Sequence, residues 1–368
     1  MNPFLISGYE RPEFFCDREN ETKRIIQSIE NSRNLTLISE RRMGKTSLLK
    51  HLMFLQQDEA TFIYIDIYPT LSMSDFIRIL SNAVLNHLEP FSEKVIRKLT
   101  NFFSAFKPKF SIDPHSGSPN LELSIGTTSE KEKSLSLLFE YIRDSEKKLV
   151  VIFDEFQQVT KYPEKNVEAL LRSEIQKDIN TSFIFSGSQT GILLSMFNSY
   201  SRPFYNSTET LYLDAIQKAE YSAFIVNKFA ANNIKIVPET ASYLYELNRG
   251  ITYNVQYLCH KLFADGNDLI TRESAEDKLT EILQENEVVY YNYRELLTSF
   301  QFQLLQAIAH QGIVEKPYGS AFIQAYSLGS TSSVRTAINS LLEKGFLIQQ
   351  KGVYLSDWYF SLWLQRQL

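Results

Sequence analysis

The chain has 368 residues, more than the roughly 100–200 of a typical domain, so two or three hydrophobic cores are expected. Apolar residues make up 43% and charged residues 22%, which excludes a disordered or low-complexity chain. The net charge of −5 disfavours a general affinity for nucleic acid.

The first half of the chain is predicted to alternate strands and helices. Residues 34–39 form a short apolar run that breaks into a loop before a helical sequence. Residues 61–70 are rich in β-branched and aromatic side chains and predict a buried strand. Residues 74–87 then follow the pattern of an amphipathic helix, with Ser72 or Ser74 as its cap.

Three more strands are predicted at residues 149–156, 181–188 and 208–216. They are apolar on both faces and separated by helical sequences. This pattern is typical of a parallel sheet covered by helices on both sides. The predicted fold class is therefore α/β, with a parallel sheet flanked by helices.

Residues 102–128 alternate apolar and polar side chains around a turn rich in Pro, Gly and Ser. This pattern predicts a β-hairpin inserted in a loop. Two roles stay open for the hairpin: it contacts a partner, or it is an insertion in the loop without a function of its own.

The second half of the chain is predicted to be mostly helical. Residues 217–287 read as short helices without strands, a helical lid. The residues that follow give three helices and a two-stranded hairpin, the order of a winged helix-turn-helix. Its third helix is predicted to be capped near Ser332 and Ser333 and to stop at Gly345. Three domains are therefore expected, at residues 1–216, 217–287 and 288–368.

Ser39 to Thr46 match a P-loop pattern in which Ser39 replaces the first glycine. In a P-loop, backbone N–H groups and the helix dipole hold a β-phosphate, and Gly44 would let the backbone approach it. Lys45 is expected to reach the β- and γ-phosphates, and Thr46 to coordinate Mg²⁺. The alternative is an incidental GKT at a helix start, which the acids downstream disfavour. The residues predicted to bind nucleotide here are Arg41, Arg42, Met43, Gly44, Lys45, Thr46 and Ser47.

Two acids, Asp154 and Glu155, stand at the carboxyl end of the predicted strand 149–156. Ligands bind at this edge in open α/β sheets. Asp154 is expected to hold Mg²⁺ through water, and Glu155 to polarise the attacking water as general base. Adjacent acids at a strand end can also be merely solvated, but their position downstream of a GKT loop favours chemistry.

Ser188 and Gln189 follow the next strand, at the same expected edge of the sheet. Either side chain could hydrogen-bond the γ-phosphate or the attacking water, which makes Ser188 a candidate catalytic residue. The alternative role for Ser188 is the N-cap of the next helix.

Several segments together resemble the archaeal-type ATPase family, within the STAND/AAA+ group of P-loop NTPases. They are FFCDRENE, SERRMGKTSLL, VVIFDEFQQV, FSGSQTGILLSMF and the closing winged helix. The resemblance implies ATP binding by an AAA+ core with a helical lid and a winged helix. It also implies that Phe15, Arg18 and Glu19 lie in an N-terminal box near the adenine, with Asp17 where a glycine is usual. On charge grounds, Arg18 and Glu19 could equally form structural ion pairs.

The chain departs from the family's pattern at two places. The lid turn is Gly250-Ile251-Thr252, and the next helix begins with Tyr253 and Asn254 rather than with an arginine suited to a sensor-2 contact. After the fourth strand the family's terminal arginine is missing. Arg202 is therefore our candidate for a finger that reaches a neighbour's γ-phosphate, and Arg172 is a weaker one. Such fingers raise hydrolysis about 10³–10⁵-fold, so slow or partner-triggered turnover is expected.

The predicted recognition helix carries Arg335 and Asn339, residue types that suit contact with DNA. Residues 295–368 contain five Lys/Arg and four Asp/Glu, fewer basic residues than a module that contacts several phosphates usually has. The aromatic tail DWYFSLWL is expected to pack within this domain or against the ATPase core. DNA binding and a protein-contact or autoinhibitory role both stay open.

We therefore predict a Mg²⁺-dependent ATPase whose nucleotide state moves the lid and winged helix, with ATP and Mg²⁺ as cofactors. The alternative is a nucleotide-gated regulatory or DNA-binding module with negligible turnover. A protein partner or self-association is expected. The two distant cysteines, Cys16 and Cys259, cannot form a disulfide framework or a zinc site, which predicts a reducing, cytoplasmic location. No apolar run approaches the ~20 residues of a membrane span, and the start lacks a signal pattern.

Overall fold

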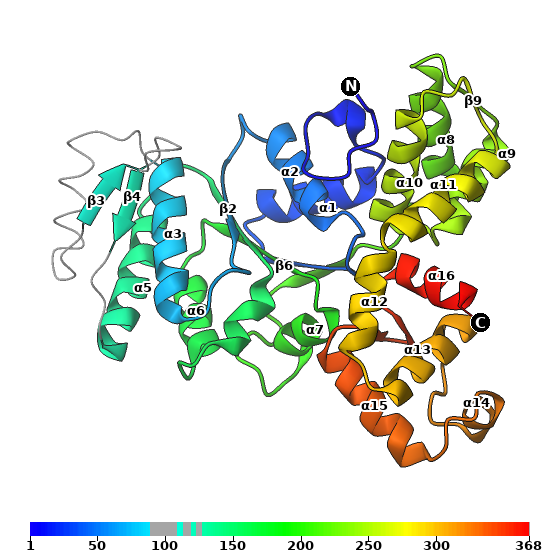
Figure 1. Ribbon diagram of the computed structural model, residues 1–368. Helices are drawn as coiled ribbons and strands as arrows, with labels where there is room; N and C mark the ends of the chain where they lie inside the picture. Colours follow the sequence, from blue (N-terminus) through cyan, green and yellow to red (C-terminus); the bar gives the residue numbers. More distant parts are fainter. Residues whose placement is uncertain (89–108, 113–118, 123–126, 368) are drawn as a thin grey trace. The chain divides into compact units, whose positions relative to one another are not determined.

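The computed structural model describes residues 1–88, 109–112, 119–122 and 127–367 (Figure 1). The chain divides into two units, which we describe separately. The sheet unit is Ser7–Ile216, and the helical unit is Met1–Ile6 with Gln217–Leu368. Residues 1–6 were predicted to belong to the N-terminal domain. Their contacts are with the helical unit, where the Asn2 amide donates to the His260 carbonyl oxygen over 2.9 Å.

A five-stranded sheet forms the centre of the sheet unit, in the order β2-β5-β6-β1-β7 with every pair parallel. This arrangement confirms the predicted α/β fold class. All five strands begin and end within the predicted ranges, and their carboxyl ends share one edge because the register pairs Asp66 with Asp154 and Ile38 with Gly187. The strands are β1 (Leu35–Ile38), β2 (Thr61–Asp66), β5 (Leu149–Asp154), β6 (Ser182–Gly187) and β7 (Glu209–Tyr212).

Two hydrophobic layers cover the sheet, one on each face. Alternate residues of a strand point to opposite faces, and β5 supplies Val150 and Ile152 to one layer and Val151 and Phe153 to the other. The first layer is completed by α1 (Glu19–Glu30) and α2 (Lys45–Leu55). The second is completed by α3 (Met73–Leu88), α5 (Thr128–Arg143), α6 (Val167–Gln176) and α7 (Thr190–Asn198).

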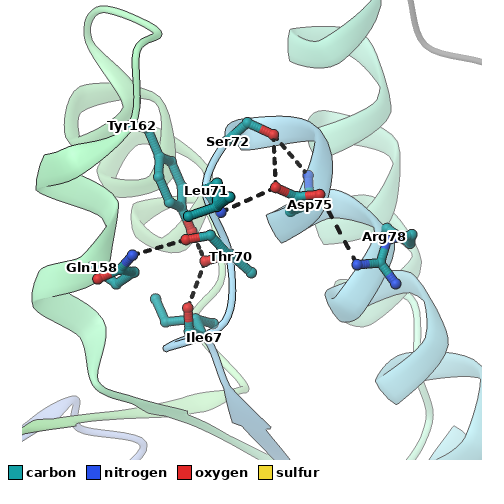
Figure 2. Close-up of polar contacts among 8 residues, drawn as sticks. All are labelled: Ile67, Thr70, Leu71, Ser72, Asp75, Arg78, Gln158 and Tyr162. Carbon is teal, nitrogen blue, oxygen red and sulfur yellow. Dashed lines mark hydrogen bonds and ion pairs between the residues drawn. The ribbon is translucent and has the colours of Figure 1, made fainter.

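The turn between β2 and α3 is tied to the 3-10 helix η3 (Phe156–Lys161), which follows β5 (Figure 2). The buried Thr70 hydroxyl shares a 2.5 Å hydrogen bond with the Tyr162 hydroxyl. The Thr70 carbonyl oxygen accepts from the Gln158 side-chain amide over 2.8 Å. At the start of α3, the Ser72 hydroxyl accepts from the Asp75 N–H over 3.3 Å, so Ser72 rather than Ser74 caps the helix. The Thr70 bonds hold the β2–α3 turn against η3 and its C-terminal end.

Within the predicted hairpin range, β3 (Lys109–Ile112) pairs antiparallel with β4 (Pro119–Glu122). In Figure 1, β4 lies beside α3 and β3 lies on the other side of β4. The rest of residues 102–126 lies outside the described residues, and a role in contacting a partner stays a prediction.

The helical unit begins with four helices that are interrupted by a small strand pair. β8 (Lys235–Ile236) and β9 (Leu269–Ile270) pair in parallel, so the expectation of a segment without strands was wrong. Each strand has only two residues, too short for a recognisable alternation pattern. The helices are α8 (Lys218–Ala230), α9 (Pro238–Leu247), α10 (Thr252–Ala264) and α11 (Arg272–Glu285).

The end of the chain has the predicted helix and strand order of a winged helix. The predicted third helix is α15 (Thr331–Glu343), and it begins earlier than expected. Its N-cap is Ser330, whose hydroxyl accepts from the Ser333 N–H over 3.1 Å, and neither Ser332 nor Ser333 caps it. Gly345 follows the helix with φ +78°, as a C-terminal glycine should. The elements are α12 (Glu287–Glu295), α13 (Ser299–Gln311), α14 (Ser320–Ala325), α15 (Thr331–Glu343), β10 (Leu347–Gln349), β11 (Val353–Leu355) and α16 (Trp358–Arg366).

The aromatic tail forms α16 and packs inside the helical unit. The Trp358 indole N–H donates to the Leu247 carbonyl over 2.8 Å, and the Tyr359 hydroxyl donates to the Asn254 carbonyl over 3.0 Å. The tail therefore joins α9 and α10 to the winged helix. Among the helices of residues 1–88 and 127–367, none combines the length and hydrophobicity needed to cross a bilayer.

An aromatic cluster behind β5 and β6 should dominate the stability of the sheet unit. The fully buried Phe185 ring lies 4.6 Å from the centroid of Phe156 and 5.1 Å from that of Phe197. We expect Phe185→Ala to lower the free energy of unfolding of this unit by about 3–5 kcal/mol, because it leaves a cavity. Hydrogen exchange of β5 and β6 peptides during a urea titration measures this unit alone. The control Tyr200→Ala, at a side chain that is 88% exposed, should cost less than about 1 kcal/mol; equal costs would contradict the prediction.

Candidate functional site

The loop between β1 and α2 turns through two left-handed residues. Arg42 has φ +68° and Gly44, the N-cap of α2, has φ +92°. Ser39, at the position of the usual first glycine, is buried and its hydroxyl donates to the Glu40 carbonyl over 2.9 Å. The loop therefore keeps a helix N-terminus facing the carboxyl edge of the sheet, although its first glycine is absent.

The Lys45 side chain is buried and folded back onto this loop. Its ammonium donates to the Ser39 carbonyl over 3.2 Å, to the Ser39 hydroxyl over 3.1 Å and to the Glu40 carbonyl over 3.1 Å. Burial lowers the pKa of Lys45 below its ordinary value, while the negative charges of Glu155 and Asp154 act in the opposite direction. Three oxygen acceptors thus surround the ammonium in the place where the motif predicts phosphate oxygens.

The other predicted loop residues differ in exposure. The Arg41 and Arg42 side chains are exposed, whereas Met43 is buried. The Ser47 hydroxyl donates to the Gly8 carbonyl oxygen over 3.4 Å, which holds the preceding segment against α2.

Asp154 is the centre of the site and receives four hydrogen bonds. Its Oδ2 accepts from the Thr46 hydroxyl over 3.1 Å and from the Tyr64 hydroxyl over 2.5 Å. Its Oδ1 accepts from the Ser186 hydroxyl and, over 3.0 Å, from the Glu155 N–H. Burial, followed by the charge of Asp154, raises the pKa of Tyr64 far above its ordinary value, so this hydroxyl stays a donor. Sequence reasoning did not single out Tyr64, and it gave no role to Ser186, although Ser186 stands in the segment FSGSQTGILLSMF.

The donor atoms gathered here suit Mg²⁺. The Thr46 hydroxyl and the carboxylate of Asp154 are hard oxygen ligands, and they already lie in contact. Mg²⁺ is usually bound by one or two carboxylates together with substrate phosphates, rather than by an all-protein cage. The residues present therefore fit the cation that the P-loop motif implies.

Glu155 is held by side chains from two directions. It has φ +56° at the start of η3, and its Oε2 accepts from the Ser188 hydroxyl over 2.9 Å and from the Gln157 amide. The helix N-cap alternative for Ser188 was wrong, because α7 begins after Gln189. A Cβ on Gly187 would lie 2.0 Å from the Gln157 Oε1, so this strand end requires glycine if Gln157 is to reach Glu155.

The segment before α1 connects to the loop through Arg18. Its buried guanidinium donates to the Met43 carbonyl over 3.2 Å and to the Glu21 carboxylate over 2.9 Å. Asp17, where the family usually has glycine, adopts φ +53°, a left-handed conformation that aspartate tolerates. Glu19 instead makes an exposed 3.8 Å ion pair with Lys23.

Phe15 packs on the side of α2. Its ring stacks on the His51 ring with a centroid separation of 4.1 Å and an interplanar angle of 16°. The His51 Nδ1 is also hydrogen-bonded to the Tyr9 hydroxyl over 2.8 Å. Sequence reasoning placed Phe15 near the site, but it did not identify the two rings that hold it.

Two parts of the chain match known protein families. Residues 15–258 match the ATPase domain predominantly from Archaea, and residues 288–366 match a probable winged helix domain. The chain belongs to this archaeal-type ATPase family. No curated protein sequence matches it.

Solved structures share the fold of this ATPase family member along nearly its whole length. A Walker-type ATPase of Pyrococcus abyssi is 19% identical with a TM-score of 0.67, covering 99% of both chains. The Aeropyrum pernix ORC2 protein, solved as ADPNP-ADP complexes, is 14% identical with a TM-score of 0.58, covering 100% of this chain and 98% of its own. The Aeropyrum pernix ORC1 protein in complex with DNA is 14% identical with a TM-score of 0.53, covering 96% of this chain and 94% of its own.

The remaining predicted residues make other contacts within their own units. Arg202 makes a 2.6 Å ion pair with Glu168 of α6, whose pKa is raised by burial although Arg202 opposes the shift. In the helical unit, Arg335 and Asn339 are exposed on α15, and the Arg335 guanidinium lies 4.8 Å from the Tyr318 ring centroid.

Arg18 should be a structural link of the P-loop. We expect Arg18→Ala to destabilise the sheet unit by about 1–3 kcal/mol, because it removes the hydrogen bonds that the buried guanidinium donates to Glu21 and to the Met43 carbonyl. It should also speed hydrogen exchange in residues 39–47. Lys23→Ala, which removes an exposed partner on the same helix, is the matched control and should change stability by less than about 0.5 kcal/mol. An unchanged exchange rate in the loop would contradict the link.

Proposed function

We propose that the protein binds ATP with Mg²⁺ and hydrolyses it to ADP and phosphate. One observation carries this proposal: Lys45 and Thr46 lie at the same sheet edge as Asp154 and Glu155, and the Thr46 hydroxyl is hydrogen-bonded to Asp154. A phosphate-binding loop, a metal-binding acid and a second acid are the parts that such hydrolysis requires. Fold-level likeness to a protein solved with ADPNP and ADP supports the proposal by analogy.

Lys45 would bind the β- and γ-phosphate oxygens. Its ammonium is already among three oxygen acceptors, and phosphate oxygens would replace the Ser39 and Glu40 groups that it contacts. The N–H groups at the start of α2 would hold the β-phosphate, and the exposed Arg41 and Arg42 add positive charge at the mouth of the loop. The loop supplies binding and orientation, not a reacting group.

Thr46 and Asp154 would hold Mg²⁺, which neutralises charge on the phosphates when it is bound. Glu155 would take the proton of the attacking water as general base. Ser188 and Gln157 orient this carboxylate by donating to its Oε2, which is a positioning role for both side chains. The function of each group follows from its charge and its contacts at the end of β5.

Turnover would be slow without a partner. Fingers add about 10³–10⁵-fold to hydrolysis, and Arg202, our candidate, is engaged with Glu168 in its own chain. An arginine in such a pair must exchange its partner before it reaches a neighbouring nucleotide. We propose that self-association or a protein partner triggers this exchange and that nucleotide state moves the lid and winged helix.

Substitutions of Lys45 and Glu155 separate binding from chemistry. Lys45→Ala should weaken ATP binding about 10- to 100-fold, because it removes charged hydrogen bonds, while Lys50→Ala on the same helix should not. Glu155→Gln should keep the affinity and lower single-turnover hydrolysis by at least about 100-fold. Fluorescent-nucleotide titration and quenched single-turnover assays measure the two effects. Equal hydrolysis by wild type and Glu155→Gln would instead favour a nucleotide-gated module with negligible turnover.

DNA binding is a second candidate function, favoured by the exposure of Arg335 and Asn339 on the third helix of the winged helix domain. The third helix of such domains is the one that enters the major groove. The near-neutral charge of residues 295–368 limits the number of phosphates that the domain could neutralise.

A salt-titrated gel shift with duplex DNA tests this function. If the domain binds DNA, affinity should fall with salt, and Arg335→Ala should weaken binding and reduce the magnitude of the salt slope by about one. The control is Lys261→Ala, which should leave binding unchanged. Lys261 lies in α10 and forms an ion pair with Glu285 of α11. Wild-type protein that shows no salt-dependent binding would rule out DNA as a ligand.

A further inference from the structure

The hydrogen-bonding capacity of Asp154 is fully used. A carboxylate offers about four acceptor positions on its two oxygens. In Asp154 these accept from Thr46 and Tyr64 at Oδ2, and from Ser186 and the Glu155 N–H at Oδ1. The carboxylate is buried, with 5% of its residue surface exposed. Any new donor or cation must therefore displace one of the four partners.

Mg²⁺ binding creates that need. Proteins bind Mg²⁺ through one or two carboxylates while the ion keeps several waters, so the acid must offer an oxygen lone pair to the cation or to one of its waters. This step rests on the proposed function, in which Asp154 serves the metal of a bound nucleotide. One existing donor must give up its place on Asp154.

Three of the four donors are poorly suited to leave. The Glu155 N–H belongs to the peptide bond that joins Glu155 to Asp154 at the end of β5, so it cannot move away from the carboxylate without a change in the backbone. Ser186 is fully buried on the neighbouring strand β6. Thr46 lies in the first turn of α2, and its hydroxyl is the predicted metal ligand, so it stays beside the acid when the metal binds.

Tyr64 is the donor that can move. It lies on β2, the other neighbour of β5, and its side chain is only half-buried. Its hydroxyl sits on Oδ2, the oxygen that also accepts from Thr46 and therefore the one nearest the predicted metal ligand. Rotation of a long, partly exposed side chain costs less than moving backbone or a buried serine.

We propose that Tyr64 is a positioning residue that occupies Asp154 Oδ2 before the metal binds and releases it when Mg²⁺–nucleotide arrives. The hydroxyl keeps the carboxylate oriented and its acceptor positions filled in the metal-free protein. It also competes with the metal for one oxygen. Tyr64 thereby sets the Mg²⁺ concentration at which nucleotide is held.

The variant Tyr64→Phe removes this competitor and leaves the ring in place. In titrations of a fluorescent ATP analogue, we expect the Mg²⁺ concentration for half-maximal binding to fall about three- to tenfold, the effect of one net hydrogen bond. Affinity for the analogue in EDTA should stay unchanged. Tyr162→Phe is the matched control, because its hydroxyl is also buried and is bonded to Thr70 rather than to a carboxylate. Its Mg²⁺ dependence should equal that of wild type.

A spectroscopic readout follows the hydroxyl directly. The full chain is labelled with 3-fluorotyrosine at its 20 tyrosines, and the ¹⁹F resonance missing from Tyr64→Phe is that of Tyr64. It should shift on addition of ATP with Mg²⁺ but not of ATP with EDTA. A resonance that does not move, or Mg²⁺ curves that coincide for wild type and Tyr64→Phe, would overturn the role of Tyr64. Absence of Lys45-dependent ATP binding in the wild type would instead overturn the proposed function itself.

Discussion

The geometry of the candidate site depends on the hydrogen bonds that the Asp154 carboxylate accepts. Asp154 ends β5, which lies between β2 and β6 in the sheet, and its hydrogen-bond donors come from the first turn of α2, from β2, from β6 and from the next residue. Parallel strands end at one edge of a sheet, so a single buried acid can collect groups that are far apart in sequence. A buried charge needs such partners, because an uncompensated carboxylate would be very costly. The same contacts that make Asp154 tolerable also align the P-loop with the second acid.

Strained backbone conformations cluster around Asp154 and the P-loop. Four residues other than glycine adopt left-handed conformations at the site: Asp17, Arg18, Arg42 and Glu155. Such conformations cost about 1–3 kcal/mol each and persist only where surrounding contacts determine them. Here those contacts are visible, since Arg18 is bonded to the P-loop carbonyl of Met43 and Glu155 to Ser188. The strain is therefore evidence that the loop, the N-terminal box and the acid pair form one mechanical unit.

Sequence reasoning predicted the parts of this unit that local pattern encodes. The five strands, the loop with Lys45 and the acids at the end of β5 were all recognisable from apolar runs and spacing. Tyr64 was missed because no local motif marks it, and Ser186, which stands in the segment FSGSQTGILLSMF, was given no role. Only the register of β2 and β6 beside β5 brings these two hydroxyls to Asp154. A hydroxyl at the end of a strand that borders an acid-bearing strand is the signal that could have found them. The N-cap Ser330 was missed for another reason, since several serines there compete to cap one helix.

Lys45, Asp154 and Glu155 are all hydrogen-bonded to groups of their own chain. Lys45 is bonded to loop oxygens, Asp154 to four donors and Glu155 to Ser188 and Gln157. In the proposed function, nucleotide and metal would therefore enter by exchanging existing hydrogen bonds. The net gain in binding free energy would be the difference between old and new partners rather than the full strength of the new ones. Local exchanges of this kind would leave the fold of the sheet unit in place, and Glu155, the proposed general base, would stay hydrogen-bonded until another group competes for it. This exchange gives a physical reason for the slow, partner-triggered turnover that we propose, because a partner needs to shift only a few hydrogen bonds to change the rate.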